Sequence, residues 1–376
     1  MESRMKKLFP CVVYLLCLAI FGFAQEIIEN PTKPLNKDSG RIVMLEEVMQ
    51  IRDVGGKYYF KYPHNLKVAP NGAIFVLDQD QFIQFDPNGK FVRNLFKKGQ
   101  GPGEMQSAGN YFFDRENIIV HEQRTDKILI FDFDGKLIKD FRIQGETRLS
   151  RFLLSQEGKY YFLSSERPVT KKTSVVDIHQ KVIEISQEGK EKKEMTEFPT
   201  IGYIAVGKQG ARVFYDISSV IAVPYRNKFM FVSHTQGYLL KLYDARKDRV
   251  IRTFKRGYRR VKTPPDTEKT GGAMLDGRPV SPPPQKFLND IQNLLVFKDR
   301  LWVVTSTTDK KKGILLDVFD SDGKYIDYFY LAFPENMVRG YHGNTALDIW
   351  EDFLYTIEQD DEGTYTIRKF KIIDKN

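Results

Sequence analysis

The sequence predicts an all-β fold, a six-bladed β-propeller whose blades are four-stranded antiparallel sheets. Three observations predict it. A strand end followed by an Asx-Gly turn and a lysine recurs as FDPNGK from Phe85, FDFDGK from Phe131 and FDSDGK from Phe319. A second motif, an apolar run after a polar turn, recurs six times. The last repeat is one strand short, and the N-terminal region contains a strand that fits the gap.

The first repeat, residues 66–95, has the pattern of four short strands. Candidate strands at 66–69, 73–77, 81–85 and 90–95 are separated by polar residues, with Asn71-Gly72 and Asn88-Gly89 in two of the turns. Asn and Gly tolerate the positive φ of a tight hairpin turn, so Asn-Gly between apolar runs is a strong hairpin signal. The repeat therefore predicts a four-stranded meander.

Both hairpins of this unit return along the chain. The first recurs as PNGAIFVLD from Pro70, ENIIVHE from Glu116, QEGKYYFLS from Gln156, RNKFMFVSH from Arg226, KDRLWVVTS from Lys298 and EDFLYTIEQ from Glu351. The second recurs in the three motifs above, in ISQEGK from Ile185 and in YDARKD from Tyr243. Aromatic and β-branched residues fill each run, as buried strands prefer. Four strands in a repeat of about 40 to 50 residues are typical of a propeller blade.

The sixth repeat predicts how the ring closes. After EDFLYTIEQ the chain has residues 365–373 for a third strand and no sequence for a fourth. A blade without its outer strand would leave an unpaired edge. We expect Glu46 to Arg52 to pair with the C-terminal strand and supply it.

The chain divides into three parts, and the first predicts export. Arg4, Lys6 and Lys7 precede an apolar run at 8–24 that contains Pro10 and ends in small residues, which is typical of a signal peptide and short for a membrane span. We assign 1–24 to a signal peptide, 25–42 to an N-terminal tail and 43–376 to the propeller, and expect a periplasmic or extracellular location. Both cysteines lie in the leader, so the mature chain has no disulfide or thiolate.

Charge and hydropathy exclude two classes of partner. The net charge is +9, and loss of the leader, with three cations and one acid, leaves +7. These charges are dispersed, whereas a nucleic-acid reader concentrates them in a stripe or module. No later stretch is long enough to span a membrane. We expect a monomer without a nucleic-acid partner or a membrane span.

Local motifs that suggest a cofactor fail on their spacing. The Asp132 and Asp320 turns begin like a calcium loop, but the twelfth positions are Ile143 and Leu331, where glutamate is needed. GQGPGE, which ends at Glu104, has no helix after it to meet a phosphate. HEQRT from His121 lacks the second histidine of a zinc helix, and no GxSxG elbow occurs. We therefore expect no cofactor from these motifs.

The chain resembles a known family. AIFVLD, FDPNGKFVRNL and the loop KKGQGPGE at 97–104 resemble the exported six-bladed propellers of the NHL-like and TolB-like group, over residues 43–376. The resemblance implies the fold and no particular activity. In similar six-bladed lactonases, a calcium ion at the channel mouth is held by Glu, Asn and Asp from different blades.

The channel mouth is the first candidate site, because each innermost strand begins there. The polar residues expected at it are His64, Asn65, Asn110, Arg151, Ser218, Ser219, Asn289, Asp290, His342 and Asn344. They include one carboxylate, fewer than calcium usually takes. Insertions at 167–177 and 256–286 are the second candidate, with Arg256, Tyr258, Arg259 and Arg260 at the start of the longer loop.

These sites predict a binding protein of unknown specificity. A glycan, a peptide or an envelope protein is the expected ligand. A calcium-dependent hydrolase or lactonase at the channel mouth is the alternative, and a scaffold without a small-molecule site is the third reading.

Overall fold

The computed structural model describes residues 27–53, 56–114, 116–144, 149–156, 158–166, 168–190, 192–226, 228–265, 273–333 and 347–374. Every regular element in these ranges is a β-strand, which confirms the predicted all-β class. No helix within them is long and apolar enough to cross a membrane. The predicted signal peptide at 1–24 lies outside the described residues.

The first two repeats form blades with the predicted four-stranded order. Blade 1 consists of β3 (Pro63–Val68), β4 (Ile74–Asp78), β5 (Gln81–Phe85) and β6 (Phe91–Asn94). Blade 2 consists of β7 (Ala108–Asp114), β8 (Asn117–Glu122), β9 (Lys127–Asp132) and β10 (Leu137–Arg142). In both blades, consecutive strands pair antiparallel in chain order.

The other four repeats form blades with additions at their edges. Blade 3 has β11 (Leu149–Gln156), β12 (Lys159–Glu166), β13 (Ser174–Ile185), β14 (Lys192–Val206) and a fifth strand, β15 (Arg212–Asp216). Blade 4 has β16 (Val220–Tyr225), β17 (Phe229–His234), β18 (Leu239–Asp244) and β19 (Arg249–Arg256). Blade 5 has β22 (Ile291–Phe297), β23 (Arg300–Asp309), β24 (Gly313–Phe319) and β25 (Tyr325–Ala332), and blade 6 has β26 (Leu347–Trp350), β27 (Phe353–Gln359) and β28 (Tyr365–Ile373). A hairpin of β20 (Ala273–Leu275) and β21 (Arg278–Val280) precedes blade 5.

The core lies between the blades. The described residues form six apolar clusters, and each cluster joins two neighbouring blades around the ring. In β4, Phe75 and Leu77 pack toward blade 2, whereas Ile74 and Val76 pack toward blade 6. Successive side chains of a strand point to opposite faces. Both faces are covered here, which explains why β4 carries the unbroken apolar run IFVL.

The aspartates of the repeated turns stabilise the turns themselves. The Asp86 carboxylate accepts hydrogen bonds from the backbone N–H groups of Asn88 and Lys90, at 2.9 Å each. Asp320 bonds the N–H groups of Asp322 and Lys324 in the same way. These are Asx turns, in which a side chain replaces a backbone acceptor. The motif is therefore repeated because each blade needs the same hairpin.

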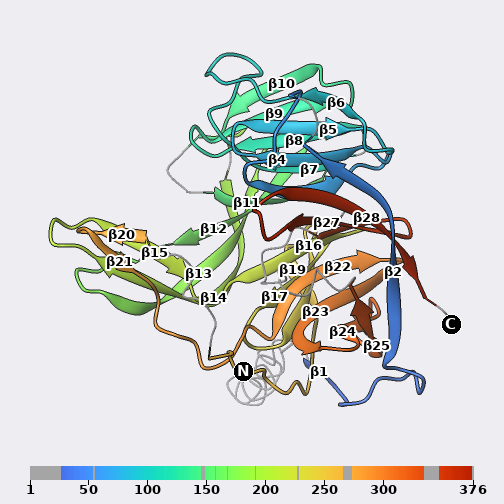
Figure 1. Ribbon diagram of the computed structural model, residues 1–376. Helices are drawn as coiled ribbons and strands as arrows, with labels where there is room; N and C mark the ends of the chain where they lie inside the picture. Colours follow the sequence, from blue (N-terminus) through green and yellow to red (C-terminus); the bar gives the residue numbers. More distant parts are fainter. Residues whose placement is uncertain are drawn as a thin grey trace, which may run out of the picture.

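The N-terminal strand closes the ring, as predicted. Residues 44–52 of β2 (Arg41–Arg52) pair antiparallel with β28 and form the outer strand of blade 6. The start of β2 also pairs parallel with β25, so one strand joins the outer edges of blades 5 and 6. Figure 1 shows the blue β2 running beside the red β28. Within the segment expected as a tail, β1 (Ile27–Asn30) pairs with β19 and covers the edge of blade 4.

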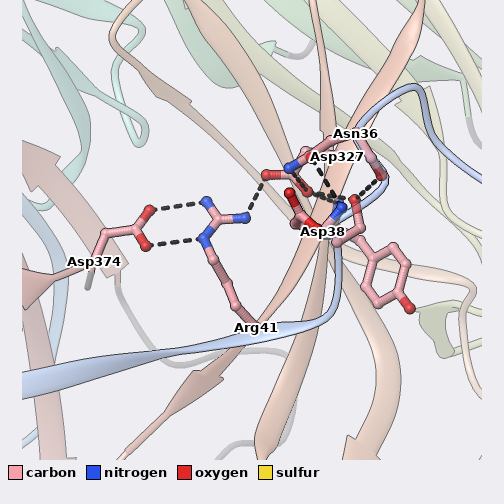
Figure 2. A network of polar contacts seen from close by, with 7 residues as sticks. Asn36, Asp38, Arg41, Asp327 and Asp374 are labelled. Atoms are coloured by element: carbon pink, nitrogen blue, oxygen red, sulfur yellow. Dashed lines mark hydrogen bonds and ion pairs between the residues drawn. The ribbon is translucent and has the colours of Figure 1, made fainter. Parts of the chain in front are cut away.

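Arg41 fixes this strand between the two blades. Its guanidinium donates to both carboxylate oxygens of Asp374 at 2.8 Å and to Asp327 of β25 at 2.5 Å. The Asp327 carboxylate also accepts bonds from Ser39 and Asn36 (Figure 2). The Asp327 side chain is 9% exposed, so its charge depends on these partners. Arg41 thereby links both ends of the chain to blade 5.

Candidate functional site

The first strands of the blades enclose a central cavity of about 650 Å³. Residues of β3, β11, β16, β22 and β26 line it, and neighbouring first strands contact one another around the ring. The cavity is therefore the channel that a propeller leaves along its axis. Its volume falls within the range of small-molecule sites.

The channel lining carries more positive than negative charge among the described residues. The described lining contains three charged residues, Lys67 of β3, Arg151 of β11 and Asp348 of β26. The Asp348 carboxylate accepts a hydrogen bond from the backbone N–H of Val68 at 2.7 Å, which joins blade 6 to blade 1. Neither Lys67 nor Arg151 forms an ion pair with a described carboxylate. Two cations therefore face the channel against one carboxylate whose lone pairs are partly used.

The surrounding protein disfavours all three charges. Burial lowers the pKa of Lys67, the nearby Asp348 opposes that shift, and Arg151 adds to it by repulsion. Burial also lowers the pKa of Arg151 and raises the pKa of Asp348. The Arg151 side chain is nevertheless open to the channel space, so a ligand can reach it. An anion placed there would compensate the cations that the fold leaves without partners.

Uncharged polar groups complete the lining. Amide and hydroxyl side chains come from blades 1, 4 and 5, and they are Asn65, Ser219, Thr235, Asn289, Gln292 and Asn293. Alternating with them are aliphatic residues of β16 and β22, such as Val220, Ala222 and Leu294. Such groups donate and accept hydrogen bonds in any direction around a ligand that fills the channel. The channel suits a polar molecule that carries several hydroxyl groups.

Asn65 shows local backbone strain at this site. Its φ of 49° lies in the left-handed region, which asparagine tolerates better than most residues. Its side-chain amide donates to the carbonyl of Gly109 at 3.2 Å, and its own carbonyl accepts from the Tyr111 hydroxyl at 2.5 Å. The neighbouring blade thus holds Asn65 in place, and the pairing of β3 with β4 shifts register between His64 and Lys67. This irregularity lies next to Lys67 in the channel wall.

The structure places some of the residues predicted for the channel mouth at the cavity and others elsewhere. Asn65, Arg151, Ser219 and Asn289 line the cavity. Asn110 instead turns into the protein, where its amide bonds the backbone of Phe152 and Tyr111. His64 is half-buried, with its Nδ1 atom 3.0 Å from the Tyr62 carbonyl. Ser218 is buried, and its hydroxyl accepts a hydrogen bond from the backbone N–H of Ile201 at 2.9 Å. His342 and Asn344 lie outside the described residues.

Arg260 and Asp290, which were both predicted as ligand-binding residues, instead pair with each other. The Arg260 guanidinium lies 2.9 Å from the carboxylate of Asp290, whose residue is 3% exposed. Burial raises the pKa of Asp290, and Arg260 opposes that shift. The ion pair joins the start of the long insertion to the start of blade 5. Asp290 is thereby held within the protein, not directed into the cavity.

The other residues predicted to bind a ligand from the long loop are Arg256, Tyr258 and Arg259, and the structure corrects the role of the first two. Arg256 is not in the loop but ends β19, and its guanidinium pairs with the fully buried Asp317 of β24. Tyr258 stacks on Tyr238 at 5.0 Å and bonds the hydroxyls of Ser306 and Thr307. Arg259 is exposed. Two of the four loop residues therefore stabilise the contact between blades 4 and 5.

Oxygen ligands for a metal are sparse in the part of the chain that the structure describes. No group of three or more His, Cys, Asp or Glu side chains converges there. Within the channel, Asp348 is the carboxylate of the described lining. A hard cation would meet two protein cations at the same place.

Sequence reasoning missed Lys67 and Asp348. It looked for polar groups where each innermost strand begins, whereas Lys67 follows the predicted Asn65 by two residues and Asp348 follows the predicted Asn344 by four. A signal for both was present, since each is a charged residue directly between apolar neighbours in a short strand, in LKV of β3 and in LDIW of β26. A charge in an innermost strand has either a partner or a channel to face.

Comparison with known proteins identifies the fold. The model of the DUF5128 family, described as a 6-bladed beta-propeller, matches residues 56–243, which is half of the chain. No curated protein matches the chain in sequence.

Solved structures with the same fold are distant in sequence. A protein from Bacteroides fragilis NCTC 9343, inferred to be exported, is 12% identical, with a TM-score of 0.50 and coverage of 93% of this chain and 100% of that one. A member of the DUF4221 family from Bacteroides vulgatus ATCC 8482 is 13% identical, with a TM-score of 0.52 and coverage of 89% and 99%. A gluconolactonase from Xanthomonas campestris is 13% identical at a TM-score of 0.44, with coverage of 90% and 99%. Similarity at this level concerns the fold and not the activity.

Proposed function

The chain belongs to the 6-bladed beta-propeller family, and on this premise we propose that it is an exported binding protein whose central channel takes a small anionic carbohydrate. The observation that carries the proposal is the presence of Lys67 and Arg151 in the channel without ion-pair partners among the described residues. Export rests on the leader sequence at 1–24.

The anionic group of the ligand supplies the missing counter-charge. An arginine presents a planar array of donors that binds a carboxylate or phosphate in two places, and a lysine adds a point charge. Where the channel wall and the ligand together exclude water from the contact, such bonds are stronger than at the surface. Arg151 is the anchor in this reading, and Lys67 strengthens the field at the same position.

The hydroxyl groups of the ligand bind to the neutral polar lining. Asn65, Asn289, Gln292 and Asn293 offer amides, which pair with sugar hydroxyls as donors and as acceptors. A cavity of about 650 Å³ accommodates one or two sugar rings. A sugar acid or a sugar phosphate combines both chemical features.

Calorimetric titration of the mature protein tests the proposal. We expect glucuronate and glucose 6-phosphate to bind and neutral glucose to bind at least about tenfold more weakly, since it lacks the charge that Arg151 and Lys67 attract. Arg151→Gln and Lys67→Gln should each weaken the anionic sugars by a similar factor and leave glucose unchanged.

Lys90→Gln is the matched control, because it removes one exposed cation from a hairpin turn away from the channel. Equal binding of glucose and glucuronate, or no effect of either channel variant, would overturn the proposal.

The calcium-dependent hydrolase remains the alternative. It requires several oxygen ligands at one place, and the described channel lining brings one carboxylate next to two cations. The charge of the channel therefore favours an anion over a divalent cation.

A further inference from the structure

The two insertions that interrupt the blade repeat come together in one projection. Residues 174–178 of β13 extend past β12 and pair with β14 alone, and β15 adds a third strand to this extension. The β20–β21 hairpin of the second insertion packs on β15. Figure 1 shows these elements projecting together from the side of the ring. We call residues 168–178, 200–216 and 273–280 the arm.

Specific bonds hold the two insertions in the arm. The Tyr215 hydroxyl accepts a hydrogen bond from the backbone N–H of Ala273 and donates one to the carbonyl of Val280, each at 2.6 Å. The Asp276 carboxylate accepts from the N–H of Lys208 at 2.6 Å. In the first insertion, the Thr173 hydroxyl accepts from the N–H of Val206 at 3.0 Å. The three loops at the tip are thereby fixed next to one another, although two of them are far apart in sequence.

The tip of the arm is strongly basic. Five exposed cations lie on these three loops and on the strand ends next to them, namely Lys171, Lys172, Lys208, Arg212 and Arg278. None of them has an ion-pair partner among the described residues, and the carboxylate of the described tip loops, Asp276, already accepts a hydrogen bond from the Lys208 backbone N–H. Like charges at close spacing repel one another. An anionic partner would remove this repulsion and thereby stabilise the tip of the arm.

Large apolar side chains stand beside these charges. Val169 is 80% exposed on the loop that bears Lys171 and Lys172, and Met274 is 64% exposed on the hairpin that bears Arg278. A soluble acidic partner would compensate the cations and leave these two in water. At the surface of a bilayer, by contrast, cations meet the lipid phosphates while short apolar side chains enter the region beneath them.

We propose that the tip of the arm docks on an anionic lipid surface. Lys171, Lys172, Lys208, Arg212 and Arg278 contact the phosphates, while Val169 and Met274 enter the interface. The ring is then held at the membrane by one side, with its channel open to ligand. This inference uses different residues from the proposed function and does not depend on it.

Co-sedimentation of the mature protein with vesicles tests the docking. We expect binding to phosphatidylcholine vesicles that contain phosphatidylglycerol, little binding to pure phosphatidylcholine, and a loss of binding as salt is raised. The double variant K171E/K172E should weaken binding by at least about tenfold, since each cation at a lipid surface contributes about fivefold. Met274→Ser should also weaken it, without changing its salt dependence.

K310E/K311E is the matched control, because it reverses two adjacent exposed lysines in the hairpin between β23 and β24. Glucuronate titration of the same variants separates the two proposals, since arm variants should leave channel binding unchanged. The docking is overturned if anionic vesicles bind no better than neutral ones, or if the control weakens binding as much as K171E/K172E. Binding of soluble polyglutamate in the absence of vesicle binding would assign the arm to an acidic polypeptide instead.

Discussion

Arg256 of β19 and Asp317 of β24 form a buried ion pair across the interface between blades 4 and 5. The Nε and Nη2 atoms of Arg256 lie 2.8 and 2.6 Å from one carboxylate oxygen of Asp317. Hydroxyl groups of Tyr238 and Tyr325 also donate to this carboxylate. Burial raises the pKa of Asp317, and Arg256 opposes that shift.

Breaking this pair should destabilise the ring. Asp317→Asn leaves the Arg256 guanidinium, whose side chain is 9% exposed, without a counter-charge. We expect the free energy of unfolding to fall by about 3 to 5 kcal/mol, measured by denaturant titration. The double variant Arg256→Met with Asp317→Leu removes both charges and should recover most of the loss. If the single and double variants were equally unstable, packing and not charge would be the cause.

The bonds of Arg41 predict a second effect on stability, at the closure of the ring. Arg41→Gln removes the cation shared by Asp327 and Asp374. We expect a loss of about 2 kcal/mol, because Asp327 is nearly buried. Faster proteolytic release of the N-terminal segment should accompany it. Arg52→Gln, at the exposed far end of β2, is the control and should change stability by less than about 0.5 kcal/mol.

Gly313 should tolerate no side chain. Its φ is 102°, and a Cβ atom at this position would lie 2.0 Å from the carbonyl oxygen of Leu331 in the adjacent strand. Gly210 also has a positive φ, 79°, but open space around it. We expect Gly210→Ala to cost about 1 kcal/mol from backbone strain alone. Gly313→Ala should cost at least about twice as much, and equal melting temperatures for the two variants would contradict this.

The affinity of the channel for an anion should change with pH under both alkaline and acidic conditions. As pH rises through the pKa of Lys67, which burial holds below that of an ordinary lysine, the ammonium loses its charge and binding weakens. As pH falls through the raised pKa of Asp348, the carboxylate becomes neutral and binding strengthens. Glucose 6-sulfate is the suitable probe, because its own charge stays constant. Lys67→Gln should remove the alkaline change and Asp348→Asn the acidic one.

Removal of calcium separates the binding function from the hydrolase alternative. We expect the melting temperature of the mature protein to stay the same after passage over a chelating resin, because two of the three charges in the described channel lining are cations. A resin is preferable to a soluble chelator, which is itself an anion that the channel could take. A drop that added calcium restores would contradict the expectation and favour the hydrolase, since a ligand that binds only the folded state stabilises it.

The sequence alone determined the blades and their closure. Runs such as AIFVL and the Asx-Gly turns specify strand and hairpin through contacts between near neighbours in the chain, so β5, β6 and the turn between them lie where the motifs predict. The pairing of β2 with β28 also followed, because the repeat counts left one strand place empty and one strand without a blade. Repeats allow long-range pairing to be predicted from sequence, because each copy must form the same four-stranded blade.

Only the tertiary structure decided what the polar residues do. Sequence analysis predicted that Arg256 binds a ligand from a loop, and it did not identify Lys67 or Asp348. Strand register and contacts between blades decide whether a charged side chain meets a partner or faces the channel. The joining of two distant insertions through Tyr215, Ala273 and Val280 was likewise invisible in the sequence. Backbone preferences act over a few residues, whereas the partner of a charge is set by segments that meet only after the chain has folded.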